Sequence, residues 1–179
     1  FQAEMAFVAI GSRPDLSDLK VEVAGLTLNE RRVIDVDDYC QSRNPKVYAV
    51  GDAVRRGSAS WARSQARVAA LHVLNKDTPP YDATGLVIGF YTEPPVAWVG
   101  ALDWNQEGIS SAHIEFGECF APWLHGNGAG FLEFAYNSGG HVVGAVALGI
   151  SAGDVLVPFS LAIRCKLTVS ELSHRRYRK

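Results

Sequence analysis

The chain has 179 residues, of which 47% are hydrophobic and 20% charged, so it is long enough for one domain or two small ones with a buried core. Its net charge of -2 argues against nucleic acid or an anionic membrane as its main partner. Its apolar runs all fall short of the roughly 18 residues that a membrane span needs.

The first half of the chain is predicted to be the end of a parallel α/β unit. Strands are predicted at residues 4–10, 33–38 and 47–50, and the last is of the short, fully apolar kind found inside parallel sheets. A helix is predicted over residues 60–74, because alanines repeat there at helical spacing and a serine stands at its start as N-cap.

The composition changes at residues 77–80, Asp-Thr-Pro-Pro, which predicts a domain boundary. The second half is rich in strand-like segments, and a hairpin turn of sequence Asn-Ser-Gly-Gly is predicted at residues 137–140. These features predict an antiparallel sheet, with strands at residues 87–91, 97–100, 112–119, 130–136 and 142–148.

Three helices are predicted around this sheet. Residues 103–108 read as a short helix, and residues 151–165 as a longer one with a wide apolar face. A further helix begins at Thr168, which with Glu171 forms the pattern of a capping box.

An acidic residue, Asp52, follows the apolar strand predicted at residues 47–50 after one glycine, Gly51. In open α/β sheets ligands bind beyond the carboxyl ends of the strands, where a carboxylate accepts hydrogen bonds from sugar or polyol hydroxyls. The helix that starts about eight residues later directs its positive end at the same place. The pattern suits a flavin with its ribityl chain, and a plain Gly-Asp turn is the alternative that stays open.

The three cysteines, Cys40, Cys119 and Cys165, lie far apart and form no CxxC pair, so the sequence offers neither a redox dithiol nor a zinc cluster. A sparse, odd count suits a reducing compartment, and we expect the cytoplasm or an organellar matrix. Cys165 is expected to fill a small apolar space, and His72 and His113 to be structural. The chain opens on Phe-Gln, so we expect it to be a piece of a longer protein or a processed one.

Five segments in this order resemble one known family. They are VAIGSRP (8–14), VYAVGDAV (47–54), SQARVAA (64–70), YTEPPVAWVG (91–100) and AGDVLVPFSLAIRCKLTVSEL (152–172). Together they resemble the C-terminal part of the FAD-dependent pyridine nucleotide-disulfide oxidoreductases, which include dihydrolipoyl dehydrogenase, glutathione reductase and mercuric reductase.

This resemblance implies a fold and two domains. Residues 1–80 match the C-terminal part of the family's FAD-binding Rossmann-like domain, which is α/β. Residues 81–179 match the α+β interface domain, whose antiparallel sheet serves dimerisation, and they end before the family's catalytic histidine segment.

The resemblance also implies roles for matched residues. Asp52 matches the aspartate that hydrogen-bonds the flavin ribityl chain, and Ala53 follows it in the same turn. Ser58, Ala59 and Ser60 match the helix start whose backbone faces the isoalloxazine ring. Gly11 and Arg13 match the stretch in which the family's chain returns from the NAD(P)-binding domain to the FAD domain.

Several of the family's parts have no counterpart in this chain. The GxGxxG segment, the redox cysteine pair and the NAD(P)-binding domain are absent, and none of the three cysteines stands at a matching position. His174 lies too early to match the family's acid-base histidine, so no catalytic residue is assigned.

The resemblance therefore implies part of a flavoprotein similar to dihydrolipoyl dehydrogenase, which transfers electrons between NAD(P)H, FAD and a disulfide or dithiol. The expected partner is a second copy, in a homodimer, and a larger multienzyme complex stays open. The 179-residue chain by itself is expected to be inactive. The alternative is a non-catalytic remnant that serves as a dimerisation or assembly module in a larger complex.

Overall fold

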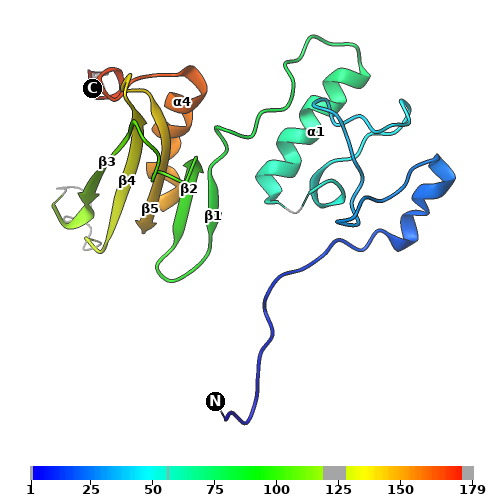
Figure 1. The fold of residues 1–179 in the computed structure, drawn as a ribbon, viewed down its shortest axis with the longest axis horizontal. Coiled ribbons are helices and arrows are strands. Elements are labelled where there is room, and N and C mark those ends of the chain that lie inside the picture. Colours follow the sequence, from blue (N-terminus) through cyan, green and yellow to red (C-terminus); the bar gives the residue numbers. More distant parts are fainter. Residues whose placement is uncertain (1, 56, 119–127, 175–179) are drawn as a thin grey trace. The chain divides into compact units, whose positions relative to one another are not determined.

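The computed structural model describes residues 2–55, 57–118 and 128–174. The chain divides into two compact units, Phe1–Tyr81 and Asp82–Lys179 (Figure 1). Each unit has its own hydrophobic core, so the two are described in turn.

The first unit consists of short turns and one long helix. Its elements are the 3-10 turns η1 (Ser17–Leu19), η2 (Val21–Ala24) and η3 (Gly51–Ala53), and helix α1 (Ala59–Val73). Single antiparallel bridges tie the segments between them, at Leu28↔Ile34, Val36↔Ser42 and Gln41↔Tyr48. A small core of Leu16, Leu26, Ile34 and Ala49 lies beneath these turns.

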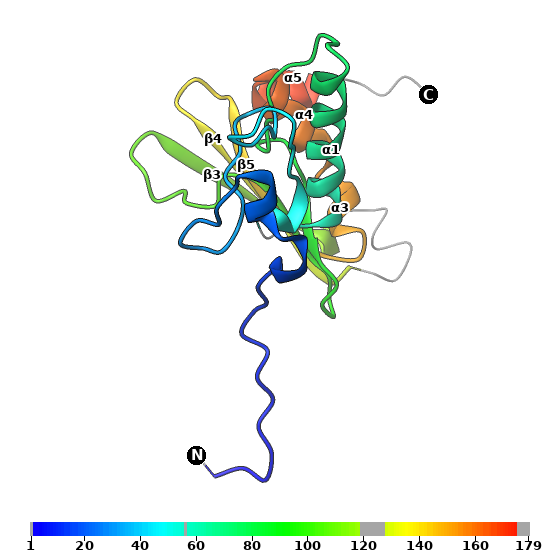
Figure 2. The ribbon, with the colours of Figure 1, turned by 90° about the vertical axis from the view of Figure 1, so that its right-hand side faces the viewer.

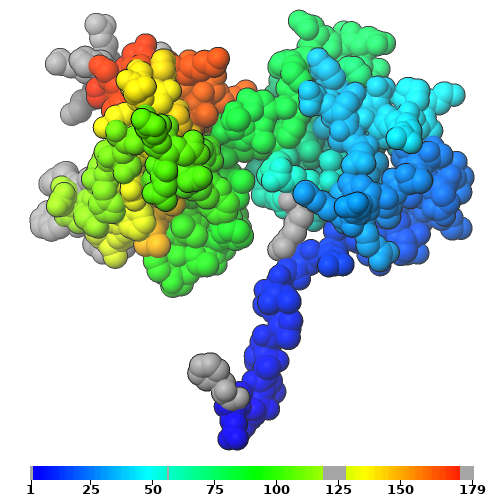
Figure 3. Space-filling view, in the orientation of Figure 1, coloured from blue at the N-terminus to red at the C-terminus, as the bar shows by residue number. Residues whose placement is uncertain are grey.

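The three strands predicted in this unit do not form. Residues 4–10 are extended, but Phe7, Val8 and Ile10 are 89%, 81% and 95% exposed, and Figure 3 shows the segment as a narrow dark-blue strip that projects from its unit. Residues 33–38 and 47–50 make single bridges only. A parallel strand needs a neighbour to supply its hydrogen bonds, and no such neighbour lies among the described residues of this unit.

Helix α1 forms as predicted, with its first residue one position earlier. Ser58 is the N-cap, because it has extended backbone angles and its Oγ accepts a hydrogen bond from the N–H of Trp61 at 3.3 Å. The helix ends at Val73, and Asn75 then turns the chain with a φ of 51°.

The second unit is built on a five-stranded antiparallel sheet in the order β1-β2-β5-β4-β3 (Figure 1). Each of the five predicted strands has a counterpart, but the third begins and ends earlier than predicted, and Phe116–Glu118 form a 3-10 turn (η4). Their bounds are β1 Ile88–Phe90, β2 Val96–Gly100, β3 Ile109–Glu115, β4 Gly130–Asn137 and β5 Val142–Gly149. The turn between β4 and β5 closes on Asn137, whose side-chain oxygen accepts from the N–H groups of Gly139 and His141.

Helices α3 (Ala152–Val155) and α4 (Val157–Cys165) cover one face of this sheet (Figures 1 and 2). Alternate residues of the central strands are fully buried against them, and Leu156 fills the centre of this core. The members of the core are Ala97, Val99, Phe116, Leu132, Ala145, Ala147, Ala152 and Leu156.

The helix predicted over residues 151–165 is interrupted at Leu156. Pro158 explains the break, because proline has no amide hydrogen and its ring clashes with the carbonyl four residues earlier. Helix α5 (Val169–His174) begins as predicted, since Glu171 accepts from the Thr168 N–H at 2.8 Å and Thr168 Oγ1 accepts from the Glu171 N–H at 3.2 Å.

The short helix predicted at residues 103–108 is absent. The side chain of Asp103 accepts a hydrogen bond from the N–H of Asn105 at 3.4 Å, and Gly108 has a φ of 82°. Both features favour a turn, which delivers the chain into β3 through a hydrogen bond from the Ile109 N–H to the Gln106 carbonyl.

Candidate functional site

The turn Gly51–Ala53 is held tightly against helix α1. Gly51 has a φ of 64° and donates its N–H to the Gln65 side-chain oxygen at 2.7 Å. A Cβ added at Gly51 would come within 3.1 Å of the Ala62 Cβ. Both the backbone angle and the close approach to α1 therefore require glycine at this position.

This turn brings Asp52 to the start of the helix, as the sequence predicts. Asp52 Oδ1 accepts a hydrogen bond from the Gly57 N–H at 3.2 Å, and Gly57 directly precedes the N-cap Ser58. The Asp52 side chain is nonetheless exposed. A carboxylate that is open to solvent therefore lies beside a helix N-terminus.

The helix start supplies hydrogen-bond donors. The N–H groups of Ala59 and Ser60, in the first turn, have no carbonyl partner within the helix. Together with the helix dipole they make this end favourable for electron-rich oxygen or nitrogen atoms. The site can thus accept hydrogen bonds at Asp52 and donate them at residues 59 and 60.

Ala53 anchors the turn to the core of its unit. Its carbonyl accepts a hydrogen bond from the Ile34 N–H at 2.8 Å, and its side chain packs against the cluster of Leu16, Leu26, Ile34 and Ala49. Asp52 is therefore supported from both sides, by the core behind Ala53 and by helix α1.

An aromatic side chain lies next to this helix start. The guanidinium carbon of Arg55 is 4.7 Å from the centroid of the Trp61 ring, a distance suited to a cation–π contact. Gly57 packs on the same ring, where an added Cβ would come within 3.1 Å of a ring carbon. The Trp61 Nε1 is buried and has no hydrogen-bond partner among the described residues.

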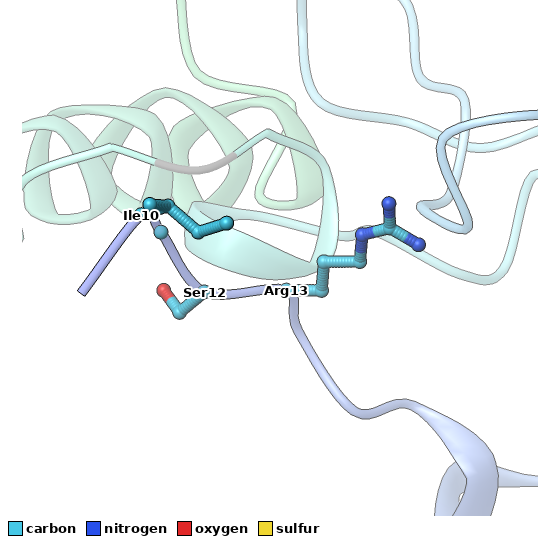
Figure 4. A pocket seen from close by; sticks show the side chains of 4 residues that line it. Ile10, Ser12 and Arg13 are labelled. Carbon is cyan, nitrogen blue, oxygen red and sulfur yellow. The ribbon is translucent and has the colours of Figure 1, made fainter. Parts of the chain in front are cut away.

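Two predicted site residues lie outside this network. Gly11 and Arg13 belong to an exposed stretch that, with Ile10 and Ser12, lines a pocket (Figure 4). Figure 4 shows the Arg13 side chain extending away from Ser12. In the part of the chain that the structure describes, no hydrogen bond or ion pair joins Arg13 to Asp52. The structure thus brings together Asp52, Ala53, Ser58, Ala59 and Ser60.

Sequence reasoning missed Gln65, which is only 5% exposed and holds the Gly51 N–H. The available signal was its position in the helix, because Gln65 falls between Ala62 and Ala69 on the buried side of α1. A polar residue on such a stripe needs a hydrogen-bond partner, and Gly51 is that partner.

His72, at the other end of α1, is structural, as predicted. Its Nδ1 lies 2.8 Å from the Tyr48 hydroxyl, and its ring stacks on Tyr39 with the centroids 4.6 Å apart. Tyr48 also accepts a hydrogen bond from Gln41 Nε2 at 2.9 Å. These contacts fasten the C-terminal half of α1 to the segment that carries the bridges.

His113 lies between two carboxylates on the sheet of the second unit. Its Nε2 is 2.8 Å from Glu115 Oε1, and its Nδ1 is 3.8 Å from Glu133 Oε2 on the neighbouring strand. The hydrogen bond with Glu115, followed by the charges of both carboxylates, raises the pKa of His113 above its ordinary value. The described residues contain no group of three or more side chains arranged to hold a metal ion.

The cysteines differ from one another in their surroundings. Cys40 is buried in the first unit, and burial raises the pKa of its thiol. Cys165 is exposed at the end of α4, so the expectation that it fills a small apolar space is wrong. The helical turns before it place Ala162 in the core instead. Cys119 lies outside the described residues.

None of the helices in the described ranges combines the length and apolar character needed to cross a membrane.

Comparison with protein families and known proteins gives consistent results. The family model described as pyridine nucleotide-disulphide oxidoreductase matches residues 1–67. A mercuric reductase of Acidithiobacillus ferrooxidans is 26% identical over 177 residues, which cover 96% of this chain and 32% of that protein. A dihydrolipoyl dehydrogenase of Bacillus subtilis is 24% identical over 96% of this chain and 37% of its own length.

Solved structures share the fold over both units. LpdA from Mycobacterium tuberculosis matches with a TM-score of 0.85 and 25% identity, over 94% of this chain and 38% of that protein. The flavoprotein disulfide reductase RclA from Escherichia coli matches with a TM-score of 0.83 and 18% identity, over 95% of this chain and 41% of its own, and shows the fold alone.

The chain spans about a third of the length of the relatives that it matches, 32% and 37% for the two named above. Family model, relatives and solved structures agree with the order of motifs in the sequence. They support the resemblance of the chain to one part of the pyridine nucleotide-disulfide oxidoreductases.

Proposed function

We propose that the first unit supplies part of an FAD site, and the second a dimerisation surface, in a flavoprotein that transfers electrons between NAD(P)H, FAD and a disulfide or dithiol. The observation that carries this proposal is the position of Asp52. Its exposed carboxylate stands beside the start of α1, tied to Gly57 at 3.2 Å. The relationship to flavoprotein families such as dihydrolipoyl dehydrogenase supports FAD as the ligand.

The residues of the site fit the chemistry of a flavin. The Asp52 carboxylate would accept hydrogen bonds from the ribityl hydroxyls, and the backbone N–H groups at Ala59 and Ser60 would donate to electron-rich atoms of the ring. The family resemblance adds Gly11 and Arg13, from the N-terminal stretch, to the proposed FAD site. When bound, FAD would carry two electrons between the nicotinamide and the sulfur acceptor.

A flavin titration tests this proposal. The chain is expected to quench FAD fluorescence, with weak affinity because it spans only about a third of its relatives' length. Asp52→Ala is expected to raise the dissociation constant about tenfold or more, since a hydrogen bond to a charged group is lost. Asp18→Ala, at an exposed aspartate in η1, is the matched control and is expected to leave the affinity unchanged.

The same preparation bears on catalysis. The chain has no segment that matches the family's NAD(P)-binding domain, so with FAD and NADH it is expected to show no diaphorase turnover. Failure of the wild-type chain to bind FAD, or equal affinities for the two aspartate variants, contradicts the FAD site. Stable dimerisation without FAD binding would instead support the alternative function, an assembly module.

A further inference from the structure

Gln65 is a buried polar side chain that forms a hydrogen bond with the backbone of Gly51. It is 5% exposed, and its Oε1 accepts the Gly51 N–H at 2.7 Å across 14 residues of sequence. Its neighbours on the buried side of α1, Ala62 and Ala69, are small and apolar. Burying an amide there is favourable only if it is hydrogen-bonded, so this bond is the reason a glutamine fits the position.

The bond acts on the backbone next to Asp52. Gly51 adopts a φ of 64° that directs its N–H at the helix, and the rest of η3 follows from that residue. A second tether joins Asp52 Oδ1 to the Gly57 N–H. The turn is thus fixed at one end by a side chain of α1 and at the other by the backbone that leads into α1.

We infer that Gln65 is a positioning residue, whose side-chain oxygen locks the Gly51–Ala53 turn onto α1 and so sets where the Asp52 carboxylate lies relative to the helix start. Its relevance to flavin affinity rests on the proposed function. The structural part of the inference, that Gln65 orders the turn, stands on the geometry alone.

Hydrogen exchange of the Gly51 amide tests the structural part. Gln65→Met keeps the length of the side chain without an acceptor, and Gln65→Glu keeps an acceptor oxygen. Gln65→Met is expected to accelerate Gly51 exchange about tenfold or more relative to amides inside α1, because a buried donor loses its partner. Gln65→Glu is expected to restore protection.

Tyr48→Phe is the matched control. It removes the hydroxyl that contacts His72 near the opposite end of the same helix, so it weakens the attachment of α1 without touching the turn. Gly51 protection relative to α1 is expected to be unchanged in this variant. Rapid Gly51 exchange in the wild-type chain, or unchanged exchange in Gln65→Met, overturns the inference. If Gln65→Met does not fold, the exchange rate of the Gly51 amide is compared in the wild-type and Gln65→Glu chains. Slow exchange in both supports the inference, and rapid exchange in either contradicts it.

FAD titration of the same variants separates the two proposals. Gln65→Met is expected to weaken FAD binding about tenfold, with rescue by Gln65→Glu and no change in Tyr48→Phe. A wild-type chain that protects Gly51 but binds no FAD overturns the proposed function and leaves Gln65 as the residue that orders the turn. FAD affinity unchanged in a Gln65→Met chain with an unprotected Gly51 overturns the role of Gln65 in the flavin site.

Discussion

At the scale of single residues, His113 gives the second unit a pH-dependent contact. The hydrogen bond with Glu115 and the charges of Glu115 and Glu133 raise the pKa of His113 above 6.5, its ordinary value. A raised folded-state pKa means that the stabilisation is complete below the unfolded value and is lost as pH rises through the folded value. The effect is small, because the side chains of His113 and Glu115 are 45% and 56% exposed.

We therefore expect His113→Gln to lower the melting temperature slightly at pH 6 and to have less effect at pH 8. Thermal unfolding of the wild-type and variant chains across this range measures the difference. His113 faces Glu115, Glu133 and the ring of Phe131. In a chain that carries Glu115→Gln and Glu133→Gln the pH dependence of the His113 effect is expected to disappear. A difference that grows with rising pH would contradict the assignment.

At the scale of secondary-structure elements, the sequence predicts those elements that depend on neighbouring residues, and not those that need a partner far away in the sequence. The hairpin of β4 and β5 was predictable because its turn residues and flanking strands lie together in the sequence. Residues 4–10 have equally strong strand character but form no strand, because a ladder needs a partner from elsewhere. The break at Leu156 was not predicted, although Pro158 stands inside the predicted helix and could have indicated it.

The candidate site divides along the same line. Asp52 and the start of α1 were predictable, because the apolar segment 47–50, the turn and the helix follow one another within a few residues, although the segment does not form a strand. The role of Gln65 depends on a contact 14 residues away and was missed. Gly11 and Arg13 came from the family resemblance alone, and the described contacts do not link them to Asp52.

The capping box of α5 gives a prediction at this scale. Thr168→Ala removes the hydroxyl that accepts the Glu171 N–H, and it is expected to cost about 1 kcal/mol of unfolding free energy. Chemical denaturation measures the loss. Ser173→Ala removes a hydroxyl that donates to the Ser170 carbonyl at the exposed end of the same helix, and is expected to change stability by less than about 0.5 kcal/mol. Equal losses in the two variants would contradict a capping role.

At the scale of the whole molecule, the second unit leaves apolar side chains exposed on its outer surface. Val157 and Leu161 are 59% and 52% exposed, and they stand four residues apart on the same face of α4. The opposite face of this helix buries Ala162 and packs Phe159 and Ile163 against the sheet. A helix with apolar residues on both sides is typical of one that is covered in an assembly.

We expect this exposed face of α4 to contribute to the proposed homodimer. Replacing Val157 and Leu161 together by glutamate places two charges on the face, so the chain is expected to become monomeric while the sheet and its core stay folded. Sedimentation velocity at several protein concentrations measures association, and circular dichroism checks the fold. Val23→Glu, at an 82% exposed valine in the first unit, is the control and is expected to leave association unchanged. A double variant that still dimerises would rule out this face and direct the search to other exposed apolar side chains of the unit, such as Phe90, Leu102 and Ile150. A wild-type chain that stays monomeric over the whole concentration range would contradict the proposed homodimer.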